Sequence, residues 1–408
     1  MHRRASLTCP LAFTLGMACL FCGRPLFAAN LVVDNLQLVS YGNYDQATGT
    51  FPVTSRLDFD LSIGGGEKFA GLLRLDFLST QVESDLATLN AAPLVATGNA
   101  NTDIASILTH INAPGLKLRT VAVTAKDIGG LPLDADYFVG NLDTFCSGDD
   151  FVTLFGAAPF ATELRGPLVY PNGIKLNPTV SWDGIYSVYG TGARLGWATS
   201  DRSQVYAYLY QDSNIGAGTG GWSSDLRGLV DFGTVKLESF AGASWDPGHA
   251  LGIYRGGLLF HVAPGDIGEF FAQIGVPEWD PTTAFTVNDI FFLFEPRVGF
   301  GHSGQLALTV FYHPAFYLQQ PTGEGGSLDV GFNLRFGRLV DSGAQGGVES
   351  YLEFRPVDPE PLTATVAPYY EVILSGVEWS FKLDLNLFPF PAPWYGILQP
   401  FVGVQTSF

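Results

Sequence analysis

The segment that decides the fold of this chain is Val377-Glu378-Trp379-Ser380-Phe381-Lys382-Leu383-Asp384-Leu385-Asn386-Leu387. Its odd-numbered residues are all apolar and its even-numbered residues are all polar. Successive side chains of a β-strand point to opposite faces, so a strand over these residues has one apolar and one polar face. Soluble strands usually run about 5–6 residues, whereas a tilted strand that crosses a bilayer needs roughly 9–11. This segment has the length of a membrane-spanning strand.

The same alternation recurs along most of the chain. A clear hairpin is predicted at 56–63 and 69–77, where Gly64, Gly65 and Gly66 supply the backbone freedom that a tight turn needs. We expect strands near 31–41, 56–63, 69–77, 184–197, 203–212, 225–232, 235–245, 251–261, 267–275, 288–300, 304–313, 327–337, 345–355, 362–372, 376–388 and 397–408. The fold class is therefore all-β: a transmembrane antiparallel up-and-down β-barrel of roughly 14–18 strands, with about 16 as the best single value.

Alternation alone also fits a soluble β-sandwich, which hides its apolar face in a core. Three features favour the membrane: the strand lengths, the full charges in the polar rows, and aromatic residues near strand ends. These aromatic residues are Tyr41, Trp197, Tyr210, Trp245, Trp279 and Trp394. The mean hydropathy is +0.20, yet no run of 18 apolar residues follows the N-terminal segment, so no transmembrane helix is predicted. A closed barrel is the other way to satisfy the backbone inside a bilayer.

Residues 1–29 have the pattern of a cleaved secretory signal, with a basic start, an apolar stretch and a small-residue cleavage site at Ala28 or Ala29. A membrane anchor, or a lipoprotein modified at Cys19 or Cys22, is the alternative. We expect one domain over 30–408, with a single remaining cysteine, Cys146, and hence no internal disulfide.

Two segments break the alternation, at 79–115 and 125–183. Thr102-Asp103 can cap a short helix in the first segment, which would form an outer loop or a plug in the lumen. The second is rich in Gly, Pro and Asp. Long irregular segments within a compact domain are often functional.

The C-terminal residues Gln399-Pro400-Phe401-Val402-Gly403-Val404-Gln405-Thr406-Ser407-Phe408 resemble the last strand of bacterial single-chain outer-membrane β-barrel proteins. In that family a terminal aromatic residue, preceded by apolar residues at alternate positions, is recognised by the barrel-assembly machinery. Val402, Val404 and Phe408 match this assembly signal. The resemblance implies export to the outer membrane of a diderm bacterium, with outer-membrane lipid and the assembly machinery as partners.

No catalytic or metal motif stands out in the sequence, and we expect neither an enzyme nor a cofactor. The histidines His110, His249, His261, His302 and His313 are scattered without metal-site spacing. Asp143, Asp149 and Asp150 are hard oxygen ligands that calcium prefers, but their spacing is more typical of a solvated acidic loop. The net charge of −18 argues against nucleic acid as a partner.

The leading functional hypothesis is a pore or transporter for small solutes or hydrophobic compounds, whose cargo the sequence does not identify. Its expected lumen-lining residues are Arg56, Asp58, Asp60, Arg74, Asp76, Arg335, Glu378, Lys382 and Asp384. Similarity to the outer-membrane fatty-acid transporters is limited to barrel size, because the Asn-Pro-Ala motif of that family is missing. The alternatives are a structural or adhesive surface protein without transport activity, and a secreted soluble β-protein or lipoprotein.

Overall fold

The computed structural model describes residues 30–43, 49, 53–64, 67–79, 116–164, 184–215, 221–245, 251–265, 268–301, 303–314, 326–339, 343–355, 361–390 and 397–407. The expected signal segment 1–29, the helix predicted after Thr102, and Phe408 lie outside these residues.

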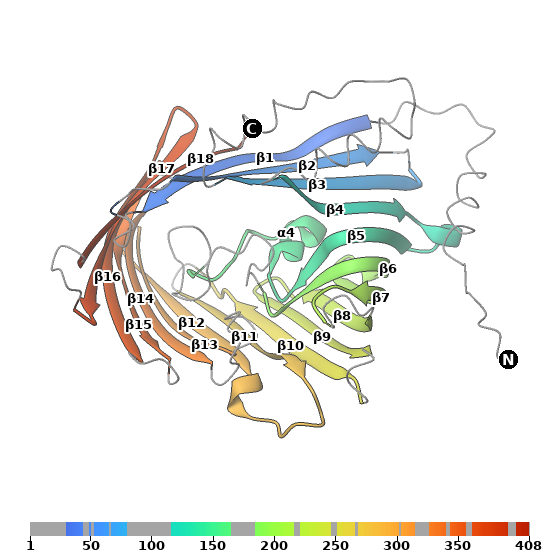
Figure 1. Cartoon of the computed structure of the whole chain (residues 1–408). Helices are drawn as coiled ribbons and strands as arrows, with labels where there is room; N and C mark the ends of the chain where they lie inside the picture. Colours follow the sequence, from blue (N-terminus) through green and yellow to red (C-terminus); the bar gives the residue numbers. More distant parts are fainter. Residues whose placement is uncertain are drawn as a thin grey trace.

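Eighteen strands form one closed antiparallel barrel, in which each strand pairs with its sequence neighbours and β18 pairs with β1 (Figure 1). The strands are β1 Asn30–Asn43, β2 Val53–Gly64, β3 Phe69–Ser79, β4 Leu116–Ala125, β5 Leu133–Phe145, β6 Tyr186–Ser200, β7 Ser203–Asp212, β8 Trp222–Asp231, β9 Val235–Trp245, β10 Ile253–Val262, β11 Gly268–Trp279, β12 Phe291–Phe300, β13 Gly304–His313, β14 Ser327–Arg338, β15 Ala344–Phe354, β16 Leu362–Leu374, β17 Val377–Phe388 and β18 Leu398–Ser407. The predicted fold class and range of strand number are confirmed, and the best single value of 16 was two strands too few.

The two strands that the sequence did not predict are β4 and β5. In β4 the apolar row changes parity, because Arg119 is an extra residue between the pairs Leu75–Leu118 and Arg74–Thr120. A bulge of this kind moves the following side chains to the other face and hides the alternation. In β5 both faces carry aromatic residues. This strand occupies 133–145, so the irregular segment expected at 125–183 is shorter than predicted.

The barrel is apolar outside and charged inside. Leu209 on β7 is 55% exposed and Leu226 on β8 is 58% exposed, while Arg227, the next residue of β8, is fully buried. A water-soluble protein rarely exposes a continuous apolar surface around a charged interior. Outward apolar and inward polar rows are the pattern of a barrel that crosses a membrane.

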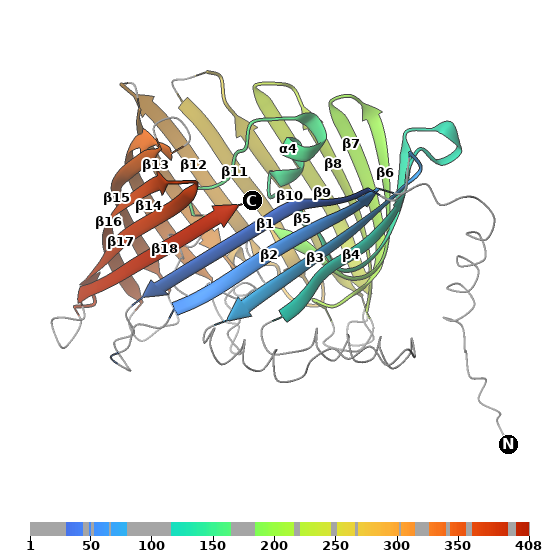
Figure 2. The same cartoon turned by 90° about the horizontal axis from the view of Figure 1, so that it is seen from above.

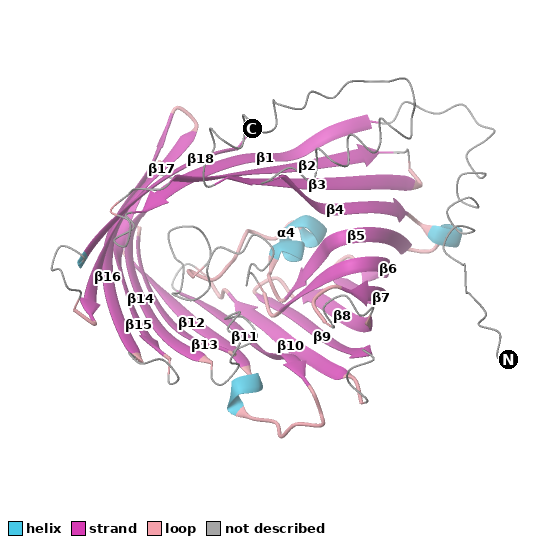
Figure 3. Cartoon of the chain, viewed as in Figure 1, coloured by secondary structure: helices cyan, strands magenta, loops and turns pink. Residues whose placement is uncertain are grey.

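The helices of the described ranges are short: α4 (Asp149–Phe155) and the 3-10 turns η2 (Ile128–Gly130) and η3 (Val287–Asp289), shown in cyan in Figure 3. No helix among the described residues is long and apolar enough to cross a membrane.

The two ends of the barrel differ in the length of their connections (Figure 2). At one end, here the short-turn end, β6 and β7 are joined through 201–202 and β8 and β9 through 232–234. The first residue of β1 and the last residue of β18 also lie at this end. At the other, the long-loop end, the connections include 80–115, 146–185 and 314–326.

Candidate functional site

Residues 146–164, here the inward segment, lie inside the ring of strands, where Figure 1 shows α4 surrounded by the barrel wall. The hairpin of β5 and β6 brings this segment inward. Gly140 on β5 has φ of 102°, a conformation that favours glycine, and a Cβ at this position would clash with the carbonyl oxygen of Arg119. Beyond Gly140 the strand pairing also shifts between Asn141 and Thr144.

Aromatic packing fills the lumen on the side of β5–β11. The Phe145 ring lies 5.2 Å from that of Tyr208 and 4.8 Å from that of Phe240. Phe160 of the inward segment stacks on His261 of β10 with ring centroids 4.2 Å apart. The inner face of the wall therefore carries aromatic rings among its polar groups where the inward segment covers it, and one side of the lumen is a packed core rather than a water-filled space.

A first set of polar contacts fixes the start of the inward segment. The backbone N–H of Cys146 donates to the carboxylate of Glu238 on β9, and the Gln273 amide on β11 donates to the Cys146 carbonyl oxygen. Burial and the negative charge of Glu238 raise the pKa of the Cys146 thiol well above its ordinary value, against the opposing effect of Arg227. The thiol is thus held in its protonated, unreactive form.

Of the three acidic residues considered from the sequence as a solvated loop, Asp149 is exposed at the start of α4, whereas Asp143 and Asp150 pair with arginines. Asp143 lies in β5, where it accepts hydrogen bonds of 2.7 Å from Arg194 and of 2.7 Å from Tyr208. Asp150 instead pairs with Arg227 of β8. Two separate arginines therefore offset the charges of these two carboxylates.

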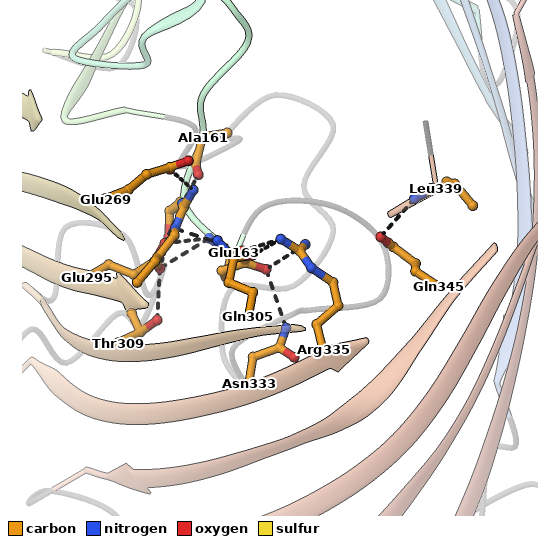
Figure 4. A network of polar contacts seen from close by, with 12 residues as sticks. Ala161, Glu163, Glu269, Glu295, Gln305, Thr309, Asn333, Arg335, Leu339 and Gln345 are labelled. Carbon is orange, nitrogen blue, oxygen red and sulfur yellow. Dashed lines mark hydrogen bonds and ion pairs between the residues drawn. The ribbon is translucent and has the colours of Figure 1, made fainter. Parts of the chain in front are cut away.

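A second set of contacts fixes the end of the inward segment to β12 (Figure 4). The fully buried Glu295 accepts hydrogen bonds from the Thr162 hydroxyl at 2.7 Å and from the Glu163 backbone N–H at 3.0 Å. Arg297 donates to Glu295 through Nε at 2.8 Å and also donates to the carbonyl oxygen of Ala161. Charged groups buried in this way are stable only when they are paired and hydrogen-bonded.

The side chain of Glu163 extends from this attachment toward β14, two strands further along the same side of the barrel. Its Oε1 lies 3.5 Å from Nη2 of Arg335 on β14, and its Oε2 lies 3.3 Å from the Asn333 amide nitrogen. The Tyr369 hydroxyl of β16 donates to the Asn333 side chain at 3.0 Å. These contacts connect the inward segment to β14 and β16.

Two adjoining polar cavities lie beside this connection. One, of about 400 Å³, is lined by Glu163, Glu269, Arg297, Asn333, Arg335, Gln345, Glu349, Tyr369 and Glu371, among others. The second, of about 680 Å³, shares Arg297, Arg335 and Gln345 with the first and reaches Gly265, Ser303 and Leu339 at the short-turn end. The barrel thus has a filled side at β5–β11 and a hollow polar side at β11–β16.

The residues expected from the sequence to line the lumen fall into two separate groups. On β2 and β3, Arg56 pairs with Asp58 at 2.7 Å and Arg74 with Asp60 at 3.6 Å, whereas Asp76 faces Arg119 at 3.8 Å.

On the far side, Arg335 contacts Glu163, and Lys382 lies between Glu349 and Asp384, at 3.2 Å from the latter. Glu378 is half-buried on the same strand, β17. The sequence did not reveal Glu163, Glu295 or Arg297, because no local pattern links residues that are 132 positions apart.

The remaining sequence expectations concern the strand ends. Val402 and Val404 lie on β18, opposite Gly42 and Ser40 of β1, at the seam that closes the barrel. Trp197 and Trp245 are exposed near strand ends, as a membrane-interface position requires. Tyr210 is fully buried and donates to Asp225, so its assignment to the aromatic belt was wrong.

Comparison with known proteins gives only a distant likeness. No family model matches the chain, and no curated protein matches it. Among solved structures, the chain is similar to two engineered variants of a porin from Rhodopseudomonas blastica, with TM-scores of 0.46 and 0.47, 12% identity, and alignments that cover 93% of this chain and 100% of that chain. A further structure, described as "Asymmetric conductivity of engineered proteins", aligns with a TM-score of 0.46 and 13% identity over the same shares. At these TM-scores the fold rests on the strand pairing of this chain itself.

Proposed function

We propose that this chain is an outer-membrane pore through which small hydrophilic solutes cross between the inward segment and the wall formed by β13–β16. The observation that carries the proposal is the polar hollow beside Glu163 and Arg335, in a barrel whose exterior is apolar. A barrel of this strand number is wide enough for an aqueous channel. Because the inward segment fills the β5–β11 side, the remaining passage is narrow.

The lining charges favour cations. The cavity beside Glu163 presents four carboxylates, from Glu163, Glu269, Glu349 and Glu371, and two guanidinium groups, from Arg297 and Arg335. Lys382 contacts Glu349, yet the acids still outnumber the bases. Rings of carboxylates are a common basis of cation preference in channels.

We further propose that the residues expected from the sequence face a water-filled lumen, of which the passage beside β13–β16 is one part and the face of β2 and β3 is another. The proposed lumen-lining set is Arg56, Asp58, Asp60, Arg74, Asp76, Arg335, Glu378, Lys382 and Asp384. In support, these side chains are arranged as opposite-charge pairs or near such pairs, which suits a water-filled wall better than a lipid-facing one.

Bacterial outer-membrane barrels have short periplasmic turns and longer extracellular loops. By that rule the short-turn end, where β1 begins and β18 ends, faces the periplasm. The inward segment then enters the lumen from the extracellular side. Export through a cleaved signal, contact with outer-membrane lipid, and recognition of Val402, Val404 and Phe408 by the assembly machinery complete the proposal.

The test is single-channel recording of the purified barrel in a planar bilayer with a KCl gradient. We expect discrete, stable current steps and a reversal potential on the cation-selective side. An adhesive or structural barrel would insert, as judged by protease protection, and show no steps. Anion selectivity would overturn the account of the lining charges while leaving the pore intact.

A further inference from the structure

A second group of polar side chains lies apart from the inward segment, near the long-loop end of β13, β14 and β15. It consists of His313, Asp329 and Glu353, which are 0%, 2% and 4% exposed. One nitrogen or oxygen from each of the three residues lies within 4.8 Å of the others. The sequence showed no metal spacing here because the ligands come from three strands, which the antiparallel pairing places side by side.

The strand register places two negative charges of this group close together. Asp329 and Glu353 are direct partners across β14 and β15, so two carboxylates face each other in a buried position. Like charges at directly opposed positions destabilise a sheet. Arg355 donates to Oε1 of Glu353, which offsets that charge from one side only. A cation between the carboxylates and the histidine would balance the group.

Neighbouring hydroxyls and the arginine orient the carboxylates. The Ser327 hydroxyl lies 3.0 Å from Oδ1 of Asp329 and 3.2 Å from Oε1 of Glu353, and its single hydrogen serves one of them at a time. Oδ2 of Asp329 is thereby directed toward His313, whose Nε2 lies 3.2 Å away. Polar groups that fix one oxygen of a carboxylate and present the other are the usual surroundings of metal ligands.

The histidine faces the carboxylates with its ring nitrogen Nε2. Its Nδ1 is buried and has no hydrogen-bond partner among the residues that the structure describes. If the ring carries its proton on Nδ1, the lone pair of Nε2 faces the Asp329 oxygen without a hydrogen between them. A metal ion at this point would accept both lone pairs. A tetrahedral zinc ion with bonds of about 2.0–2.1 Å sets its donors about 3.3 Å apart, close to the separation found here.

We infer that His313, Asp329 and Glu353 form a binding site for a divalent transition-metal ion of the zinc or cobalt class. Imidazole nitrogen selects such ions over calcium and magnesium, which take oxygen ligands. Three protein ligands leave further coordination positions for water. The ligands project from three hydrogen-bonded strands of the wall, so the backbone holds them side by side.

The test is a titration of the folded barrel, purified in detergent without a polyhistidine tag, with Co²⁺ while visible absorption is recorded. We expect one Co²⁺ per chain, displaced by one equivalent of Zn²⁺ and retained in excess Mg²⁺. His313→Gln, Asp329→Asn and Glu353→Gln should each weaken binding by at least about tenfold. His261→Gln is the matched control, since it removes another buried histidine on the inner wall and should leave binding unchanged.

Heat-modifiable migration on gels verifies the fold of each variant. The wild-type titration needs no variant, so it decides the question even where a substitution prevents folding. Absence of a cobalt band in the wild-type barrel would overturn the inference. Undiminished binding by folded His313→Gln, or an equal loss in His261→Gln, would also overturn it by placing the metal elsewhere.

Discussion

Glu163 of the inward segment and Arg335 of β14 meet inside the lumen, with Oε1 and Nη2 3.5 Å apart. Because the Glu163 backbone is held to Glu295 on β12, this pair joins the anchored segment to a second strand on the same side of the barrel. A charged contact therefore borders the proposed passage, and its chemistry can be changed one group at a time.

Glu163→Gln should lower the preference for cations and increase open-channel current noise. The substitution removes one of the carboxylates beside the cavity and weakens the contact with Arg335, while the backbone anchor to Glu295 remains. The reversal potential in a KCl gradient measures the first effect. Glu67→Gln, the same change in an exposed turn, is the control. Equal reversal potentials for the two variants would contradict the assignment of Glu163 to the passage.

Glu295→Gln should loosen the inward segment without opening the barrel. Removing one partner of a buried ion pair costs roughly 3–5 kcal/mol, and here Arg297 and the Thr162 hydroxyl both lose their charged acceptor. We expect faster proteolysis within residues 156–164, located by mass spectrometry, at unchanged heat-modifiable migration. If the cleavage rate stayed at the wild-type level in a folded barrel, Glu295 would not be the anchor.

How well the sequence predicted a strand depended on the side chains that its two faces carry. Strands β9 and β13 were predicted at their observed bounds because outward-facing and inward-facing residues alternate along them. Strand β5 was missed because its inward side chain Phe138 packs in the filled half of the lumen, so both of its faces carry aromatic residues.

The site was harder to foresee than the strands. Arg335 was recognised as part of a polar row, but its partner Glu163 lies in a segment without alternation. Asp329 and Glu353 become neighbours only through the register of β14 and β15. Contacts of this kind depend on strand register and on the path of the inward segment, and local patterns in the sequence do not encode them.

Cys146 should resist maleimide in the folded protein. The raised pKa of its thiol leaves less thiolate than an ordinary cysteine would have at a given pH, and complete burial blocks access. Peptide mass spectrometry should therefore detect almost no maleimide at Cys146 at pH 7, and raising the pH to 8 should hardly increase the labelling. Unfolding in denaturant should restore an ordinary rate.

Thr199→Cys, at an exposed position near the short-turn end, provides the reactive comparison within the same barrel. Labelling of folded Cys146 at the rate of the introduced cysteine would mean that the inward segment is not packed against Glu238 and Gln273.

Val348→Arg should destabilise the barrel in the membrane. Val348, near the middle of β15, is 41% exposed on the apolar exterior, and an arginine on a lipid-facing position costs roughly 2–4 kcal/mol at the bilayer midplane. Gln345→Arg, an inward position of the same strand beside the polar cavities, should cost much less. Urea titration of the barrel refolded in lipid vesicles compares the two. Equal losses would contradict the assignment of the two faces.

The most direct measurement of the central claim is thiol modification during single-channel recording. Gln345→Cys places a thiol beside both proposed parts of the passage, whereas Ser223→Cys places one on the filled side, where the native serine is fully buried. A bulky, charged methanethiosulfonate reagent should reduce the conductance of the first variant in one step and leave that of the second unchanged. A block at Ser223→Cys together with none at Gln345→Cys would contradict a passage between the inward segment and β13–β16.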